Sequence, residues 1–583
     1  MAKWQRSFFQ PVLPLGEDGR RVTGSKEHIA LSRMAAGEGM VLLKNEKNTL
    51  PIRKGTKVAL FGKGTVDYVK GGGGSGDVTV EYIRNLYEGM KIKEDEGKVE
   101  VFDKLAKYYE EDIQKQYADG AVPGMTVEPE LPDELLNEAR EYTDTAVITI
   151  CRFSGEGWDR KCEAAQDGYV LDGEEKRNSE LSAKIFENGD FCLTNAENAM
   201  VEKVKKTFPH VIVVMNVGGI VDTKWFRDCD EIQSVLMAWQ GGMEGGLATA
   251  DILCGDVNPS GKLSDTYAKD LEDYPSTANF HESAFYVDYT EDIYVGYRYF
   301  ETIPGAAEKV NYPFGYGLSY TTFEYENLQV KPDGVTFTIR NTGKYDGAEI
   351  AQLYVGLPGA KVFRPVKELK GFTKVFLKTG EEKTVTIKFD DKTFRYWNMK
   401  TNKWEVEGGV YSIMIGASCA DIRLQDTLAI IGTTEIMPYY TNRVASYMDG
   451  KIQKVGNEEF ETILGHSIPD GSWSGELGMN DALCQMYYAK SGIARFICKK
   501  LGEKLKKSEA AGVPDLNTLF QYNMPFRAIA KMTGGMVSME MVEGLVRVVN
   551  GHFSGLGKVI SGFFRNQKLN KQYENCLLYT SDA

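Results

Sequence analysis

Short apolar runs alternate with helical stretches through the first half of this chain. The runs are KVALFGK, AVITIC, VIVVMNVG and SVLMAW, at residues 57–63, 146–151, 211–218 and 234–239. Stretches with helical spacing lie between them, such as DELLNEAREY (133–142) and NAENAMVEKVKKTF (195–208). Strands that alternate with helices form a mostly parallel sheet that is covered on both faces. Residues 25–268 are therefore predicted to fold as an α/β sandwich domain. At its start, residues 25–45 also have helical spacing, with Ser25 as the N-cap.

The pattern changes after Tyr320, where apolar and polar residues alternate with a period of two. This holds for VTFTIRN, AQLYVGL, KVFLKTG, EKTVTIKF and GVYSIMIGAS, with Gly, Asp and Asn between them. Such a pattern is typical of a small antiparallel β-sandwich, which we place at residues 319–430. Residues 269–318 form a linker rich in Tyr and Gly. We expect its tyrosines 294, 297 and 299 to pack against the sandwich.

Residues 440–575 are predicted to form a helical tail. Its helices are expected at residues 482–507 and 541–566. Charged side chains interrupt the second of these, so we expect its apolar face to pack on protein and not on lipid. The last eight residues, CLLYTSDA (576–583), resemble a translated sequencing adapter and are excluded from the fold prediction.

Charge and composition exclude several classes of function. The net charge is −14, which argues against a nucleic-acid partner. The sequence has no long uncharged apolar stretch, so no membrane partner is expected. The nine cysteines form no CxxC pair, which favours free thiols in a reducing, cytoplasmic location. The five histidines are dispersed without metal-ligand spacing, and neither a metal site nor a cofactor is predicted.

The stretch FSGEGWDR follows the second apolar run and places Glu156 between two glycines. Ligands of parallel sheets bind at the carboxyl ends of the strands, where this loop would lie. Trp158 offers a face for stacking on a sugar ring. A carboxyl beside an aromatic ring has a raised pKa and can act as a general acid. Asp159 and Arg160 are expected to hold the shape of the loop. Taken by itself, the stretch also fits a solvated turn.

Several motifs together resemble the family 3 glycoside hydrolases, the β-glucosidase family. They are EGMVLLKNEKNTLPI, KGGGGSGDV, SGEGWDR, WQGGMEGGLATADILCGDVNPSGKL and YVGYRYFE with YPFGYGLSYTTFEY, in this order. The resemblance covers about residues 30–430. It implies an α/β sandwich domain followed by a fibronectin type III-like domain. It also implies a glycoside or oligosaccharide substrate and Glu156 as the acid/base residue.

The resemblance places the glycine loop Gly71–Gly76 beside the substrate pocket, with Gly73, Gly74 and Ser75 as binding residues. From the residues alone, this loop also fits a phosphate-binding loop or a flexible turn, although it lacks a GKS or GKT ending. Glu244, in the QGGMEGG stretch, is interpreted as a carboxylate that stabilises a helix N-terminus.

A retaining glycosidase needs a second carboxylate as its nucleophile. The resembled family takes this residue from a separate (β/α)8 barrel, which is not found in this sequence. Three hypotheses remain. In the first, the barrel is lost here or supplied by a partner chain. In the second, Asp67, Asp77 or Asp159 of this chain serves as the nucleophile, and the helical tail closes the pocket. In the third, the protein is a non-catalytic carbohydrate-binding or scaffold protein. Oligomer formation is left open.

Overall fold

The structure is a computed structural model that describes residues 24–73, 78–121, 125–153, 183–279, 287–468, 475–510 and 515–580. The chain divides into two compact units, one of which spans Thr23–Pro469. The second consists of Met1–Val22 and Asp470–Ala583. Within the described residues, no helix is long and apolar enough to cross a membrane.

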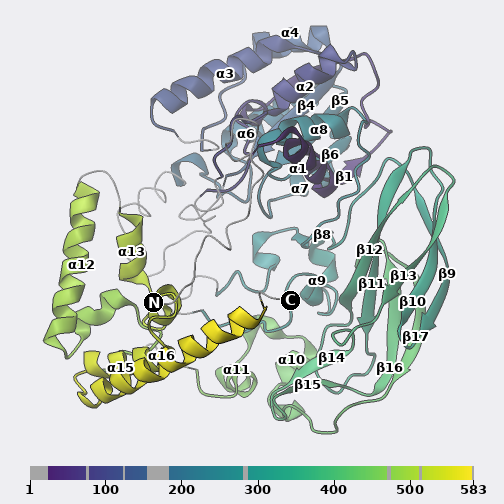
Figure 1. The fold of residues 1–583 in the computed structure, drawn as a ribbon. Coiled ribbons are helices and arrows are strands. Elements are labelled where there is room, and N and C mark those ends of the chain that lie inside the picture. Colours follow the sequence, from purple (N-terminus) through teal and green to yellow (C-terminus); the bar gives the residue numbers. More distant parts are fainter. Residues whose placement is uncertain are drawn as a thin grey trace. The chain divides into compact units, whose positions relative to one another are not determined.

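A six-stranded sheet forms the centre of the α/β domain, with strand order β1-β6-β5-β4-β2-β3. Four of its strands, β1, β4, β5 and β6, are labelled in Figure 1. β1 runs antiparallel to β6, and the other neighbours are parallel. The four predicted runs all form strands of this sheet. The strands are β1 (Val41–Asn45), β2 (Thr56–Phe61), β3 (Val99–Val101), β4 (Thr145–Cys151), β5 (His210–Asn216) and β6 (Ser234–Met237).

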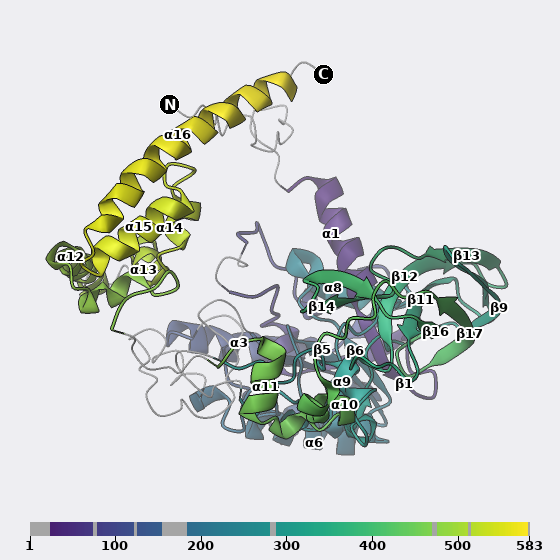
Figure 2. The same cartoon turned by 90° about the horizontal axis from the view of Figure 1, so that it is seen from below.

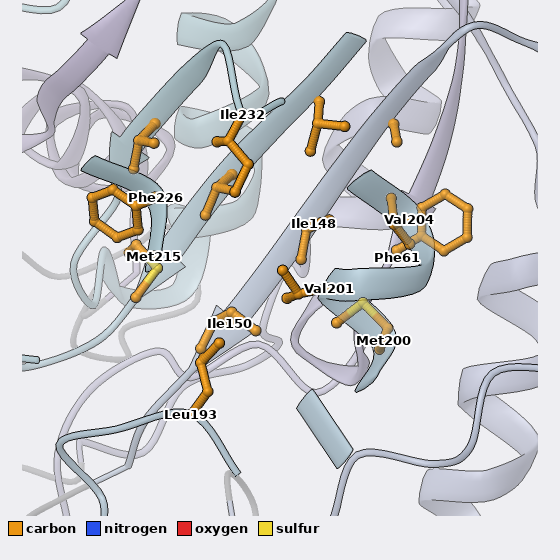
Figure 3. Close-up of a cluster of buried hydrophobic side chains, with 14 of the residues drawn as sticks. Phe61, Ile148, Ile150, Leu193, Met200, Val201, Val204, Met215, Phe226 and Ile232 are labelled. Carbon is orange, nitrogen blue, oxygen red and sulfur yellow. The ribbon is translucent and has the colours of Figure 1, made fainter. Parts of the chain in front are cut away.

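Helices cover both faces of this sheet, as predicted. Along β5, Val211, Val213 and Met215 point into one core, while Ile212 and Val214 point into the other. α3, α4 and α6 complete the first core, part of which is shown in Figure 3, and α2 and α8 complete the second. The helices are α1 (Lys26–Gly39), α2 (Leu86–Asp95), α3 (Asp103–Ala118), α4 (Asp133–Tyr142), α6 (Asn195–Thr207), α7 (Lys224–Arg227) and α8 (Gly245–Leu253).

The expectation of helical structure over residues 25–45 is only half correct. Ser25 caps α1 as predicted, and its side chain accepts a hydrogen bond from the His28 backbone N–H. The helix ends at Gly39, however, and Val41–Asn45 forms the edge strand β1. The apolar run in this segment fits a buried strand as well as a helix. Pairing with β6 buries Val41 and Leu43 in one core and Leu42 in the other.

The described part of the predicted linker contains the short helix α9 (Tyr297–Phe300) and the short strand β8 (Val310–Tyr312). β8 pairs with β7 (Tyr267–Ala268), at the end of the predicted α/β domain. Tyr297 packs against the β-sandwich as expected, since its hydroxyl accepts a hydrogen bond of 2.8 Å from the Leu369 backbone N–H. Tyr294 and Tyr299 share a core with Val362 of the second domain and with the segment around Tyr447, and the Tyr294 ring lies 6.1 Å from that of Phe363.

The second domain is a two-sheet β-sandwich, as predicted. Its sheets have strand orders β13-β10-β9 and β12-β11-β16-β17, and a separate hairpin joins β14 to β15. The core between the sheets contains Phe337, Leu353 and Ile413. The strands are β9 (Phe323–Lys331), β10 (Gly334–Asn341), β11 (Gly347–Gly356), β12 (Glu368–Leu377), β13 (Glu382–Lys388), β14 (Arg395–Asn398), β15 (Lys403–Val406), β16 (Gly409–Gly416) and β17 (Ile422–Ile430).

The predicted helical tail is divided between the two units. α10 (Ala445–Asp449) and α11 (Asn457–Leu464) belong to the larger unit. The smaller unit is helical (Figure 2), although the helix expected over 541–566 is two helices. The first of these two helices ends at Val549, and in the turn that follows Gly551 has a φ of 86°. The helices are α12 (Gly492–Ala510), α13 (Leu516–Asn523), α14 (Ala528–Met532), α15 (Met539–Val549) and α16 (Ser554–Thr580).

Candidate active site at the carboxyl ends of the parallel strands

The loop that carries the predicted acid/base residue leaves the sheet at the carboxyl end of β4. Its stretch 154–182 lies outside the described residues, so the structure does not place Glu156, Trp158, Asp159 or Arg160. Both ends of the loop are described, however. The chain enters it at Arg152 and Phe153 and returns from it at Ala183. The contacts at these two ends show how the loop is held.

Arg152 is the first residue after β4, and it forms a buried ion pair with Glu197 of α6. Its two terminal nitrogens donate to the two carboxylate oxygens, at 2.7 and 2.8 Å. The side chains are only 3% and 2% exposed. Burial opposes ionisation of Glu197, but the guanidinium outweighs this effect and lowers the pKa of the carboxyl. The pair is therefore charged on both sides at neutral pH.

The same guanidinium joins the two ends of the loop. Its Nε donates to the Asp190 carbonyl at 3.0 Å, and a terminal nitrogen donates to the Cys192 carbonyl at 2.8 Å. A further bond reaches the Cys151 carbonyl at the end of β4. Bidentate pairing fixes the orientation of an arginine side chain. Arg152 thus clamps the entry of the loop to its return.

Glu197 is held in turn by the start of its own helix. Thr194 is the N-cap of α6, and its hydroxyl accepts a hydrogen bond from the Glu197 backbone N–H at 3.1 Å. The Glu197 carboxylate accepts one from the Thr194 backbone N–H at 2.9 Å. This capping box places the carboxylate at the positive end of the helix dipole, which stabilises its charge.

Asn216, the last residue of β5, connects the neighbouring loops. It is fully buried, and its side chain exchanges two hydrogen bonds with the backbone of Val69, at 2.7 and 3.0 Å. It also donates to the Trp239 carbonyl at 2.7 Å. Its own carbonyl accepts from the Arg152 backbone N–H at 3.1 Å. Through its side-chain amide and its backbone carbonyl, Asn216 thus links the chain segments that follow β2, β4, β5 and β6.

The glycine loop starts beside the turn between β6 and α8. The Lys70 carbonyl accepts a hydrogen bond from the Gly242 backbone N–H at 2.8 Å, and Lys70 Nζ donates to the Val78 carbonyl at 2.9 Å. Of the predicted binding residues, the structure describes only Gly73, because Gly74 and Ser75 fall in the stretch 74–77 outside the described residues. The loop therefore begins at the same edge of the sheet as the Arg152 clamp.

Glu244 is the N-cap residue of α8, so it lies at a helix N-terminus as the sequence suggested. Its side chain makes no capping hydrogen bond to that helix. It is buried and accepts a hydrogen bond of 2.5 Å from the Tyr82 hydroxyl. The Arg84 guanidinium lies 3.5 Å from its other oxygen. The carboxylate thus also holds the segment that follows the glycine loop.

A second polar cluster lies next to β2. Lys63 Nζ donates to the Thr126 hydroxyl at 2.9 Å, and that hydroxyl donates to Asp67 at 2.6 Å. Glu128 accepts a hydrogen bond from the Lys63 backbone N–H at 2.9 Å. Burial raises the pKa of Glu128 to about 8. Within the residues that the structure describes, no group of His, Cys, Asp and Glu side chains is arranged to hold a metal ion.

Comparisons with known proteins agree with this architecture. The model of the glycosyl hydrolase family 3 C-terminal domain matches residues 40–320, and that of the fibronectin type III-like domain matches residues 349–419. The chain carries the C-terminal domain of the family 3 glycosyl hydrolases. The family and the fold class inferred from the sequence motifs are thus confirmed.

Several β-glucosidases are similar to this family 3 chain. Beta-glucosidase A of Butyrivibrio fibrisolvens is 53% identical over 468 residues, which are 76% of this chain and 56% of that protein. Thermostable beta-glucosidase B of Acetivibrio thermocellus is 32% identical over 532 residues, 90% of this chain and 60% of that protein. The structure of beta-glucosidase 3B of Thermotoga neapolitana in complex with α-D-glucose has a TM-score of 0.60 and 34% sequence identity. The match covers 70% of this chain and 55% of that chain. The chain thus spans little more than half the length of these relatives.

Within the family 3 domain, Asp67 is poorly suited to act as a nucleophile. Its side chain is buried, and its two oxygens accept hydrogen bonds from the Tyr117 and Thr126 hydroxyls. A carboxylate with both oxygens engaged inside the domain serves to hold the segment around Thr126. Asp77 and Asp159 lie outside the described residues.

Sequence reasoning missed Arg152, Glu197 and Asn216 as residues that shape this family 3 site. Arg152 carried a usable signal, because an arginine directly after a mostly apolar run must find a buried partner. Its partner lies 45 residues further along the chain, and no local pattern indicates it.

Proposed function

We propose that this chain is part of a retaining β-glycosidase of the β-glucosidase type, with Glu156 as its general acid/base. The observation that carries the proposal is the Arg152 clamp, which joins the chain segments before and after the undescribed stretch at the carboxyl edge of the sheet. In the sequence, SGEGWDR begins three residues after the end of β4, between these two segments. The similar β-glucosidases support the glycoside substrate.

In this mechanism, Glu156 acts twice. It first donates its proton to the glycosidic oxygen as the bond to the anomeric carbon breaks and a carboxylate nucleophile takes that position. The glutamate, now ionised, then removes a proton from a water molecule, whose oxygen attacks the anomeric carbon and releases the nucleophile. Trp158 provides a face for the sugar, and Asp159 and Arg160 hold the loop. Gly73, Gly74 and Ser75 border the bound glycoside.

We place the nucleophile on a barrel domain outside the sequence described here, either in the same protein or in a partner chain. Two observations support this. The relatives are longer than this chain, and Asp67 is engaged in internal hydrogen bonds. The similar β-glucosidases favour an enzyme over the alternative of a non-catalytic carbohydrate-binding or scaffold protein. We also propose a reducing, cytoplasmic location, which is supported by the free thiols of the seven cysteines whose side chains the structure describes.

Hydrolysis of p-nitrophenyl β-glucoside by the full-length gene product tests the function. Glu156→Gln is expected to lower kcat/KM by about 10²–10⁴-fold, because the leaving oxygen loses its proton donor. Glu141→Gln, at an exposed position of α4, is the matched control and is expected to leave turnover unchanged. Wild-type turnover that survives Glu156→Gln at full rate would contradict the assignment.

A further inference from the structure

The hairpin formed by β14 and β15 presents two tryptophans to solvent. Trp397 and Trp404 are directly paired across its two strands, with ring centroids 5.4 Å apart and ring planes at 73° (hairpin labelled in Figure 1). They are 45% and 54% exposed. The whole chain contains only seven tryptophans. Large aromatic side chains that stay half-exposed on one surface mark binding sites more often than single exposed aliphatic side chains do.

The hairpin has one anchored face and one open face. Side chains alternate along a strand, so Arg395 lies on the same face as Trp397, while Asn398 lies on the opposite face. Asn398 is fully buried and donates a hydrogen bond of 2.6 Å to the Ile436 carbonyl. The Arg395 guanidinium lies over the Trp404 ring, 4.3 Å from its centroid. The same guanidinium also donates to the Asp391 carboxylate. The open face therefore combines two indole rings with an ion-paired guanidinium that is positioned against one of them.

Hydrogen bonds hold this face rigid at both ends. At the turn, the Asn398 side chain accepts from the backbone N–H groups of Lys400 and Thr401, at 3.0 and 3.3 Å. At the open end, the Val406 backbone N–H donates to the Thr433 hydroxyl at 2.8 Å, and its carbonyl accepts from the Thr433 N–H at 2.9 Å. A surface that is ordered in advance loses little conformational entropy when a ligand binds.

Stabilisation of the hairpin alone does not account for this arrangement. Paired aromatic residues do strengthen antiparallel strands. In the same domain, the pair Tyr325 and Phe337 does so within the sandwich core, where the two residues are 9% and 0% exposed. The hairpin is already fixed through Asn398 and Thr433. Its tryptophans nevertheless keep about half of their surface in solvent.

We propose that the open face of hairpin β14–β15 is an accessory binding surface for a neutral glucan chain. A pyranose ring has apolar C–H faces and a polar rim of hydroxyls. Two indoles at 73° form a corner in which such a ring lies on one aromatic face and touches the other. The Arg395 guanidinium, beside Trp404, donates to ring hydroxyls. The choice of glucan as the ligand rests on the proposed function, but the site is separate from the Glu156 loop.

Native gel electrophoresis of the full chain, in gels with and without neutral mixed-linkage β-glucan, tests the proposal. The glucan is expected to retard the wild-type protein, and Trp397→Ala with Trp404→Ala is expected to weaken this binding at least tenfold. The matched control replaces Phe372 and Phe376 of β12 by alanine. These residues are 67% and 54% exposed on the same domain, and their loss is expected to leave retardation unchanged.

Two further variants keep the outcomes separable. Trp397→Phe with Trp404→Phe preserves aromatic faces, so it is expected to retain part of the binding and to rule out misfolding as the cause of loss. Glu156→Gln is expected to abolish hydrolysis but to be retarded like the wild type, which separates this surface from the catalytic proposal. The proposal is overturned if wild-type protein is not retarded, if the double alanine variant binds equally well, or if the Phe372 and Phe376 control loses binding to the same extent.

Discussion

Two buried glutamates of the α/β domain show how partners decide the charge of a carboxyl group. Glu197 is 2% exposed and Glu128 is 4% exposed. Glu197 meets the Arg152 guanidinium with both oxygens, and its pKa is lowered despite burial. Glu128 accepts a hydrogen bond from the Lys63 backbone N–H, and within the part of the chain that the structure describes no hydrogen bond reaches its other oxygen. Burial then dominates and raises its pKa to about 8.

The two glutamates therefore support the segments at the carboxyl ends of the strands in different ways. The Arg152 and Glu197 side chains form a fixed pair of charges that stays in place over the whole neutral range. The cluster at Glu128 instead contains a carboxylic acid that is protonated in the folded domain at neutral pH. Only the first kind of support joins the two ends of the loop that follows β4, so we expect the two regions to respond differently to mutation and to pH.

Breaking the ion pair should have the largest effect. Arg152→Ala leaves the Glu197 carboxylate buried without its partner, which is expected to cost about 3–5 kcal/mol of unfolding free energy. Turnover per folded molecule should also fall, because the carbonyls of Asp190 and Cys192 lose their common donor. Urea unfolding and p-nitrophenyl β-glucoside hydrolysis measure the two effects. A variant as stable and active as the wild type would contradict the clamp.

The pH dependence of stability should distinguish the two glutamates. Glu128 has a raised folded pKa, so its contribution is full below the unfolded pKa near 4.5 and declines as pH rises toward about 8. The slope is at most about 1.4 kcal/mol per pH unit. Glu197 behaves oppositely, and its contribution is lost as pH falls through its lowered pKa. Glu128→Gln is expected to remove the decline between pH 5 and 8, measured by urea unfolding at each pH. A decline that persists in this variant would assign it to another group.

A buried ion network away from the loop provides the next comparison. Asp251 of α8 accepts two hydrogen bonds of 2.6 Å from Arg33 and lies 2.7 Å from Lys93. Asp251→Asn is expected to lower the unfolding free energy by about 1–3 kcal/mol, less than Arg152→Ala, because Lys93 keeps Asp256 as a partner. Turnover per folded molecule should not change. A loss of kcat in this variant would show that any damage to the domain impairs the site.

The smallest effect on stability is expected when both members of the clamp are replaced together. Arg152→Met with Glu197→Leu fills the same space without leaving a buried charge, so the unfolding free energy should change by no more than about 1–2 kcal/mol. The carbonyls of Asp190 and Cys192 still lose their donor, and kcat is expected to fall. Stability and kcat that both match the wild type would show that the clamp has no positioning role.

Much of the fold could be predicted because it depends on local patterns. Apolar runs gave four strands of the sheet, and period-two alternation gave the β-sandwich. The strand Val41–Asn45 was missed because its apolar residues also satisfy helical spacing, and only pairing with β6 decides between the two. The helix expected over 541–566 overlooked Gly551, whose positive φ ends α15 and starts a turn.

The site could be predicted only in part. Glu156 stands out through its glycines and neighbouring tryptophan. The residues that hold its loop do not, since Arg152 meets Glu197 across 45 residues and Asn216 meets Val69 across 147. Such contacts depend on which strands become neighbours in the sheet. The hairpin tryptophans were missed for the same reason, because their pairing and exposure follow from the register of β14 and β15.

Chemical rescue tests the role of Glu156 most directly. Glu156→Ala in the full-length gene product is assayed with 2,4-dinitrophenyl β-glucoside, whose leaving group needs no proton donor, with and without sodium azide. If Glu156 is the acid/base residue, the glycosyl-enzyme intermediate accumulates, and azide attacks it without base assistance. The account predicts a faster steady-state rate with azide and a β-glucosyl azide product. A rate that azide does not change, with glucose as the only product, would contradict it.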